Sequence, residues 1–264
     1  MIKEIRKELK LIWLSTYYAL QREMLNKISF LSSVVFMILN DACFIVEWLV
    51  IFALKSDING FSFKEVLLLW GLSAGMYGFS RFSFKKAFSI SNTIVDGSLD
   101  AYLVQPKNVL ISVISSDVSA SAFGDIIYAY IILIFYGLTF YNFILFTLFC
   151  ILGAILQISV SVIYGSLSFW LRNSDVIEDQ SEHLMVSFST YPESIFKGFI
   201  KVLFFTILPV GYTTFLPARL ILNFDIKVML ALVVIDMLFT ILAVGIFYKG
   251  LKKYSSSSLM TARV

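Results

Sequence analysis

The sequence predicts an all-α integral membrane protein with six transmembrane helices, preceded by an amphipathic helix that lies in the membrane interface. Three observations lead to this fold class. Of the 264 residues, 59% are hydrophobic and 15% are charged, against roughly 45–50% and about 25% in a soluble domain. The apolar residues gather in runs long enough to cross a bilayer. Lys and Arg fall mainly between alternate runs.

This composition excludes several classes of protein. The 26 Phe side chains are too many for one soluble core of this length, and a net charge of +3 provides no basic face for nucleic acid. A spanning helix takes about 20 residues, so six of them leave room only for short connections. We therefore expect residues 1–264 to form a single membrane domain with no appended catalytic domain and no nucleic-acid partner.

The first element is a basic helix within residues 1–27. Its apolar residues recur at helical spacing, and Lys and Arg continue as far as Lys27. No uninterrupted apolar stretch follows the first basic residues, which argues against a signal peptide. A basic helix with Trp13 and Tyr17 on its other face is typical of the headgroup plane of a membrane. A soluble helix packed on a partner surface is the alternative.

Six apolar stretches follow, and each is predicted to span the membrane. They lie within residues 28–248, at 28–54, 66–84, about 118–138, 143–171, 199–217 and 228–248. The second stretch carries Gly71, Gly75 and Gly78, a spacing that lets helices approach closely, either within the chain or at a dimer seam. In the fifth, Pro209 is expected to kink or break the helix, and Pro217 lies where that helix should end.

The orientation follows from Lys and Arg, because cytoplasmic loops carry an excess of them. With six spans, 17 of the 21 fall on the side that holds both termini and the connections near 85–107 and 172–198, and four fall on the other. We therefore expect a multi-pass protein of the cell membrane with both termini in the cytoplasm. Residues 249–264 form a cytoplasmic tail in this arrangement.

Several motifs that carry chemistry are missing. The chain has no G-x-x-x-x-G-K-[ST] phosphate loop, no G-x-G-x-x-G, no H-E-x-x-H and no C-x-x-C. The only histidine, His183, has acidic neighbours and is expected in a solvated loop. Cys43 and Cys150 lie in apolar runs and are expected to be buried free thiols. We therefore expect no enzyme activity, no catalytic residue, no metal and no cofactor bound by this chain.

Ionisable residues within the predicted spans are candidates for lining a translocation path. Burying an Asp at the bilayer centre costs ~2.5–3.5 kcal/mol on insertion scales, so such residues need a reason. The candidates in and beside the spans are Asn40, Asp41, Glu47, Asp125 and Asp236. No single helix face presents an acidic track at 100° per residue, so the pattern does not support a proton relay. Hydrogen bonds between helices or positions at the interface are the alternative.

The stretch between the second and third spans is the most informative one. Its key residues are Asp96, Gly97, Leu99, Asp100, Leu103 and Pro106. The glycine interrupts the chain, the leucines recur at helical spacing, and the proline ends the segment, while both aspartates lie where a helix dipole favours anions. This predicts a short amphipathic helix whose apolar side docks into a groove of another protein. A capped loop helix without a partner is the alternative.

Several motifs in a fixed order carry a family resemblance. After the basic N-terminal helix come Gly97-x-Leu-Asp-x-x-Leu-x-x-Pro106, Tyr191-Pro192 with Ile195-Phe196, Leu208-Pro209, Phe215-Leu-Pro-Ala218 and Gly250-Leu-Lys-Lys-Tyr254-Ser255. In this order they resemble the ABC-2 type transporter permeases, the six-span stand-alone membrane subunits of ABC exporters, over nearly the whole chain. The ending of that branch commonly has Glu where Ser255 stands, which weakens any role for this position.

The resemblance implies an ATP-driven exporter. Two permeases, identical or related, pair in the lipid bilayer, and two cytoplasmic ATPase subunits that bind ATP and Mg²⁺ dock beneath them. Residues 96–106 couple ATPase closure to the spans, and Tyr191 and Pro192 in the second cytoplasmic loop add a secondary contact. The substrate, a hydrophobic or amphipathic drug, peptide or lipid, passes along parts of spans one, two and five. The fifth span adds Pro209 to the candidate path residues.

Two other function classes remain as alternatives. An ion-coupled secondary transporter would use the buried acidic residues as ion sites, but the sequence has no evident internal repeat. A membrane enzyme that acts on lipid would need clustered polar catalytic residues at the interface, and the sequence does not provide them.

Overall fold

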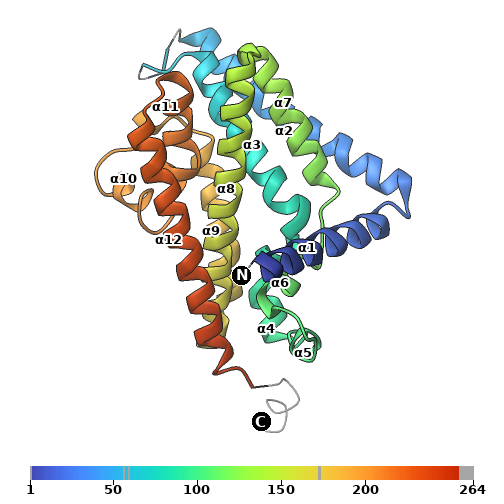
Figure 1. The fold of residues 1–264 in the computed structure, drawn as a ribbon. Coiled ribbons are helices and arrows are strands. Elements are labelled where there is room, and N and C mark those ends of the chain that lie inside the picture. The colour runs from blue at the N-terminus through green and yellow to red at the C-terminus, as the bar shows by residue number, and fades with distance from the viewer. Residues whose placement is uncertain (1, 56, 59, 172–173, 256–264) are drawn as a thin grey trace.

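The computed structural model describes residues 2–55, 57–58, 60–171 and 174–255, which form a helical bundle (Figure 1). No β-strand occurs in these ranges, which hold a single isolated β-bridge between Ile58 and Phe61. We call the end of the bundle that holds residues 90–114 the base and the opposite end, which holds residues 60–62, the apex. The fold therefore belongs to the predicted all-helical class.

The N-terminal helix is present as α1 (Ile2–Glu23). It packs lightly, against α6 and α3, and leaves its aromatic face uncovered. Trp13 is 70% exposed and Tyr18 is 64% exposed. Such a face suits the headgroup region assigned to it from the sequence.

Three helices in the described part of the chain are long and apolar enough to cross a membrane. They are α2 (Lys27–Leu54), α8 (Phe140–Ser166, continued by a 3₁₀ turn to Phe169) and α12 (Ile226–Leu251), and they correspond to the first, fourth and sixth predicted spans. The third predicted span is the shorter apolar helix α7 (Ser121–Gly137). Cys43 is exposed on α2 rather than buried, whereas Cys150 of α8 is buried as expected.

The second predicted span is α3 (Phe63–Phe84), the most buried helix of the bundle. A capping box starts it, because the Ser62 hydroxyl accepts from the Glu65 amide while the Glu65 carboxylate accepts from the Ser62 amide at 2.7 Å. The helix lies between α7 and α8, as Figure 1 shows. Its polar side chains therefore face other helices of the same chain.

The glycine stripe of α3 brings this helix close to its neighbours. A Cβ on Gly75 would lie 2.5 Å from Sγ of Cys150, and one on Gly78 would lie 2.6 Å from Cγ1 of Ile126. A Cβ on Gly71 would lie 2.9 Å from Cγ2 of Ile132 on α7. Of the two roles predicted for Gly71, Gly75 and Gly78, packing within the chain is the one observed.

The fifth predicted span is not one continuous helix, and the interruption falls at Pro209, where a kink or break is expected. Residues 199–217 are divided among α10 (Phe199–Leu203), a run of turns, a π-helical turn at Gly211–Phe215 and the start of α11 (Leu216–Leu222). Pro209, which has no amide hydrogen to donate, lies in the interruption. Pro217 lies in the first turn of α11, where a missing amide hydrogen costs nothing, so it begins a helix instead of ending one.

The predicted cytoplasmic connection 172–198 is largely a helix, α9 (Ser174–Ser189). It starts at the base and runs beside α8 toward the apex (Figure 1). Its buried face carries serines, and the hydroxyl of Ser181 donates back to the Glu178 carbonyl at 2.7 Å. Small hydroxyls satisfied in this way can be buried against another helix, which is why a polar sequence packs here. His183 therefore lies on a helix, where it is exposed, and not in a loop.

Beyond α9 the chain has reached the apical half of the molecule. The Tyr191 ring packs edge-on against Trp48 of α2, with centroids 5.8 Å apart. The Glu193 carboxylate forms an ion pair with Arg219 of α11 at 2.6 Å. The prediction that residues 172–198 lie wholly at the side that holds 85–107 is therefore wrong. Arg172 lies outside the described residues.

Three short helices build the base, together with the lower ends of α8 and α12. They are α4 (Ile90–Val95), α5 (Asp100–Leu103) and α6 (Val109–Ile114). A buried apolar group, here called the basal cluster, joins them: Ile90, Ile94, Leu99, Leu110, Val113, Val162, Ala243 and Phe247. The predicted tail 249–264 begins within α12, and its residues 256–264 lie outside the described part of the chain.

Candidate functional site

A cavity of about 390 Å³ opens between α2, α3, α7 and α9. This volume falls within the range of roughly 300–1,000 Å³ that is usual for small-molecule sites. Its lining includes four acidic residues, Asp41, Glu47, Asp125 and Glu182. It also includes five aromatic residues, Phe44, Trp48, Trp70, Tyr77 and Tyr191. We call this space the central cavity.

Most of the path residues predicted from the sequence line the central cavity. Asn40, Asp41 and Glu47 come from α2, and Asp125 comes from α7. The carboxyl groups of Asp41 and Asp125 lie close enough to each other in this lining to interact. No single helix face carries an acidic track, but two helices together bring these carboxyl groups to one place.

Two other predicted path residues lie elsewhere. Asp236 is buried on α12, at 5% exposure, and is not among the residues that line the central cavity. Pro209 is also absent from that lining. The structure therefore separates the candidate path residues into one group around the cavity and two outliers.

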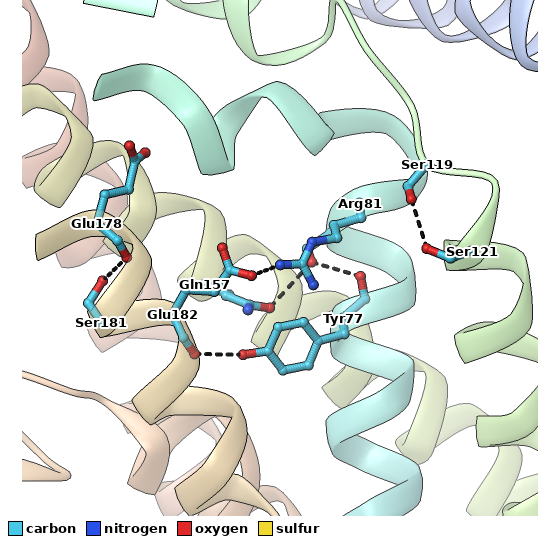
Figure 2. A network of polar contacts seen from close by, with 9 residues as sticks. Tyr77, Arg81, Ser119, Ser121, Gln157, Glu178, Ser181 and Glu182 are labelled. Carbon is cyan, nitrogen blue, oxygen red and sulfur yellow. Dashed lines mark hydrogen bonds and ion pairs between the residues drawn. The ribbon is translucent and has the colours of Figure 1, made fainter. Parts of the chain in front are cut away.

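A polar network closes the central cavity on the side of α9 (Figure 2). Arg81 of α3 forms an ion pair with Glu182 of α9. Its guanidinium also lies over two aromatic rings, 5.0 Å from the centroid of Tyr77 and 4.7 Å from that of Phe88. The Tyr77 hydroxyl donates to the Glu182 backbone carbonyl at 3.4 Å, so that α3 and α9 are joined twice.

Sequence reasoning did not identify this network. Arg81 stands near the end of the predicted span 66–84, and Glu182 stands in the predicted connection 172–198 among other acidic residues. A second pair of side chains extends the network to α8, because the Ser80 hydroxyl donates to Oε1 of Gln157 at 3.3 Å. The sequence does contain opposite charges beside two different spans. It does not show that Arg81 and Glu182 form a pair, because their pairing depends on the packing of α9 on α3.

The loop 96–106 at the base has a compact internal structure. Gly97 adopts φ +76°, a left-handed conformation that favours glycine, and the Asp96 carboxylate accepts from the Ser98 amide at 2.9 Å. The Leu99 amide then donates to the Thr93 carbonyl at 3.1 Å. The expected amphipathic helix is a single turn, α5, that follows this bend.

The apolar side chains of this loop do not all face outward. Leu99 is fully buried in the basal cluster, so the expectation that it docks into a partner is wrong. Leu103 is 40% exposed and Val104 is 83% exposed. The apolar surface that the loop presents is therefore formed by Leu103 and Val104, with Pro106 beside them and also exposed.

A buried carboxylate holds the segment that leads into this loop. Oε1 of Glu178 accepts from the Ile90 amide at 3.1 Å, and Oε2 accepts from the Ser91 amide at 3.0 Å, so α9 caps α4 across the fold. Gly165 makes the space, because a Cβ there would lie 2.5 Å from the Glu178 carboxylate. Burial raises the pKa of Glu178 to about 7, against the lowering effect of the two amides.

The C-terminal motif Gly250–Ser255 also reaches the loop. Burial, followed by a hydrogen bond and charge interaction with Asp100, raises the pKa of Tyr254 to about 12. Asp100 of α5 therefore also interacts with Tyr254, which follows α12. Tyr191 and Pro192 lie in the apical half, away from residues 96–106, which corrects their placement in a cytoplasmic loop next to this segment.

Comparison with known proteins gives one match. A family model described as ABC-2 family transporter protein matches residues 35–258. That range includes the central cavity, the 96–106 loop and the described part of the C-terminal motif. No curated protein and no solved structure matches the chain.

Proposed function

Because the chain belongs to the ABC-2 family of transporters, whose members are transmembrane permease subunits and not themselves catalytic, we propose that it is the permease of an ATP-driven exporter. It pairs with a second permease, identical or related, in the cell membrane. Two cytoplasmic ATPase subunits, which hold ATP and Mg²⁺, dock at the base, where both termini also lie in the cytoplasm. The exported compound is hydrophobic or amphipathic and passes through the central cavity.

One observation carries this proposal: the 96–106 loop is exposed at its tip and anchored at its root. Leu103 and Val104 are available for a partner, while Leu99 and Glu178 tie the loop into the bundle. An apolar tip of this kind fits a groove on another protein. A loop anchored in this way can also pass a displacement on to the helices behind it.

Helix α9 supplies the route from the loop to the cavity. Glu178 caps α4, which leads into the loop, and Glu182 pairs with Arg81 in the cavity wall. These two glutamates are four residues apart and so lie on the same face of α9. Displacement of the loop by an ATPase therefore moves the cavity wall through one helix.

The test is purification of the tagged chain from its own cells, with mass spectrometry of the complex. A cytoplasmic ATPase is expected to co-purify, and the double variant Leu103→Asp, Val104→Asp is expected to lose at least 90% of it, because a charge cannot enter an apolar groove without a cost of several kcal/mol. The matched control is Phe224→Asp, an exposed apolar residue between α11 and α12 at the apex, which should retain the ATPase. Intact association and ATP-driven efflux in the double variant would contradict the proposal.

A second function is favoured by the closeness of Asp41 and Asp125. Two carboxyl groups in contact resemble an ion site, so the chain alone could act as an ion-coupled transporter. Transport driven by an ion gradient in liposomes that contain only this chain, and abolished by Asp125→Asn, would support this function over the exporter.

A further inference from the structure

The central cavity has the properties of a site for one chemical class of ligand, and we propose that it binds a compact aromatic organic cation that carries a hydrogen-bond acceptor. This names the substrate class of the permease and in that respect rests on the proposed function. Binding itself is a property of the chain alone. Three independent features of the lining indicate this class of ligand. They are its acidic side chains, its unpaired polar atoms and its aromatic rings.

The first feature is an excess of acidic side chains over basic ones. Glu182 is neutralised by Arg81, but Asp41, Asp125 and Glu47 form no ion pair with any residue that the structure describes. His183 is the remaining basic side chain of the lining. Because charges attract more strongly away from bulk water, a cation gains most from such a wall.

The second feature is a pair of unsatisfied buried polar atoms. Oδ2 of Asp41 and Nε1 of Trp70 have no hydrogen-bond partner among the described residues, although these residues are only 6% and 8% exposed. A buried polar atom without a hydrogen-bond partner lowers the stability of the fold by about 1–3 kcal/mol, so a partner that the free chain lacks is expected at each of these atoms. A ligand supplies both partners when a positively charged group faces Asp41 and an acceptor oxygen faces the Trp70 indole.

The third feature is the arrangement of the rings. Phe44 stacks on Trp70 with centroids 4.7 Å apart and planes 28° apart, and Trp48 packs edge-on against Tyr191. Indole faces attract cations more strongly than other rings do. The cavity already holds one such contact of its own, the Arg81 guanidinium over Tyr77. Flat aromatic walls beside free carboxylates select a cation with an aromatic body.

The size of the cavity narrows the class further. A space of about 390 Å³ is at the lower end of small-molecule sites, roughly 300–1,000 Å³, and suits a compact ligand rather than a long peptide. The carboxylates of Asp41 and Asp125 lie close together, so they form one point of negative charge instead of a track. A single delocalised positive charge matches this arrangement.

The experiment compares two ions of nearly the same shape and opposite charge. Tetraphenylphosphonium and tetraphenylborate are equilibrated with the full-length chain in nanodiscs, and binding to empty nanodiscs is subtracted. Saturable binding is expected for the phosphonium only. Asp41→Asn and Asp125→Asn should each weaken it at least tenfold, whereas Asp236→Asn, which removes a buried acid outside the cavity, should leave it unchanged.

Two results would overturn the inference. One is tetraphenylborate binding as tight as that of the phosphonium, and the other is phosphonium binding that neither Asp41→Asn nor Asp125→Asn weakens. If the acidic variants do not fold, Trp70→Phe provides a separate test. It should weaken binding of rhodamine 6G, a cation with an ester carbonyl, at least fivefold and leave the phosphonium, which has no acceptor, unaffected. Unchanged rhodamine affinity would also overturn the inference.

The same variants separate this inference from the proposed function. Helix α2, which carries Asp41, lies away from α5 in Figure 1, so Asp41→Asn should retain the co-purifying ATPase. Phosphonium binding to a chain that recruits no ATPase would uphold the site and reject the exporter. ATP-driven efflux of other compounds without phosphonium binding would uphold the exporter and reject the cation site.

Discussion

At the scale of single residues, two glutamates on α9 bind different neighbours and stabilise different parts of the molecule. Glu178 is 1% exposed and accepts two amide hydrogens at the start of α4, while Glu182 lies one turn further and pairs with Arg81. The first holds the base and the second holds the wall of the central cavity. A specific donor group faces each carboxyl group, two backbone amides for Glu178 and a guanidinium for Glu182.

Glu178 should make the stability of the protein depend on pH. Its pKa is raised from 4.5 to about 7, mainly by burial, so the folded state binds the proton more tightly than the unfolded state. Stability is therefore highest below the unfolded pKa and falls as the pH rises through about 7, by up to about 3 kcal/mol. Glu178→Gln should flatten this decline in thermal unfolding midpoints measured in detergent between about pH 5 and about pH 8.

The control for this experiment is Asp179→Asn, which removes the neighbouring exposed carboxylate. It should leave the wild-type slope in place. Parallel slopes in the wild type and in Glu178→Gln would show that this carboxyl group does not titrate as inferred.

Part of the central cavity could be predicted from single residues, and part could not. Asp41 and Asp125 are candidates for the translocation path from the sequence alone. Burying a carboxyl group inside an apolar run costs free energy, so such a residue points to a function or a specific contact. Trp70 and Tyr77 are not such candidates, because aromatic residues are common in this chain and their sequence neighbours do not distinguish a cavity wall from a core. The burial of Glu178 could not be predicted, because the two amides that donate to it lie 87 and 88 residues away in the sequence.

At the scale of elements, the most extensive helix contact is that between α3 and α7, and Gly78 lies in it. Gly78→Ala would place a Cβ 2.6 Å from Ile126 Cγ1 and 2.9 Å from the Ile126 backbone nitrogen, so α7 itself must shift. We expect a loss of roughly 1–3 kcal/mol, measured as a lower thermal unfolding midpoint. Gly245→Ala on α12 is the matched control, because no described atom lies within 4 Å of the new Cβ and helix propensity favours alanine by about 1 kcal/mol.

A Gly78→Ala variant that unfolds at the wild-type temperature would show that α3 and α7 are not as close as described. A Gly245→Ala variant that is as destabilised as Gly78→Ala would show that the loss comes from glycine itself and not from this contact.

Elements were predictable where a long apolar run decides them. Helices α2, α8 and α12 follow from length and hydropathy alone, since a run of this kind forms a helix whatever its neighbours are. The region 199–217 is equally apolar but is interrupted, because Pro209 removes a donor and Phe204 packs into the core beside Phe215. The polar helix α9 depends on the surface of α8, which the local sequence does not describe.

At the scale of the whole molecule, the base and the apex differ in what they expose. The base carries α4, α5, α6 and the end of α12, and the apex carries short turns. The revised path of residues 174–222 moves Lys197 and Lys201 away from the cytoplasmic group of 17 Lys and Arg residues, and a strong excess remains on that side. The inferred orientation, with the base in the cytoplasm, therefore survives the correction.

This orientation can be measured by labelling single cysteines in whole cells after Cys43 and Cys150 have been replaced. A cysteine at Asn223 or at Lys197 should react with an impermeant maleimide added outside, because Asn223 directly follows α11, Lys197 precedes α10, and both helices lie in the apical half of Figure 1. A cysteine at Gln105 should react only after the membrane has been opened. Labelling of Lys197 together with Gln105 would restore the cytoplasmic connection that the sequence predicted.

The two anchors on α9 also determine how this helix can move. Glu178 and Glu182 are separated by one turn, about 6 Å along the axis, and each is bound to a different part of the bundle. A rod held at two points on one face cannot roll about its own axis without losing both attachments. Sliding along the axis would also strain both at once. The freedom that remains is a rotation about the line through the two carboxylates. Because this line runs along the helix, such a rotation carries α9 as a whole sideways past α8.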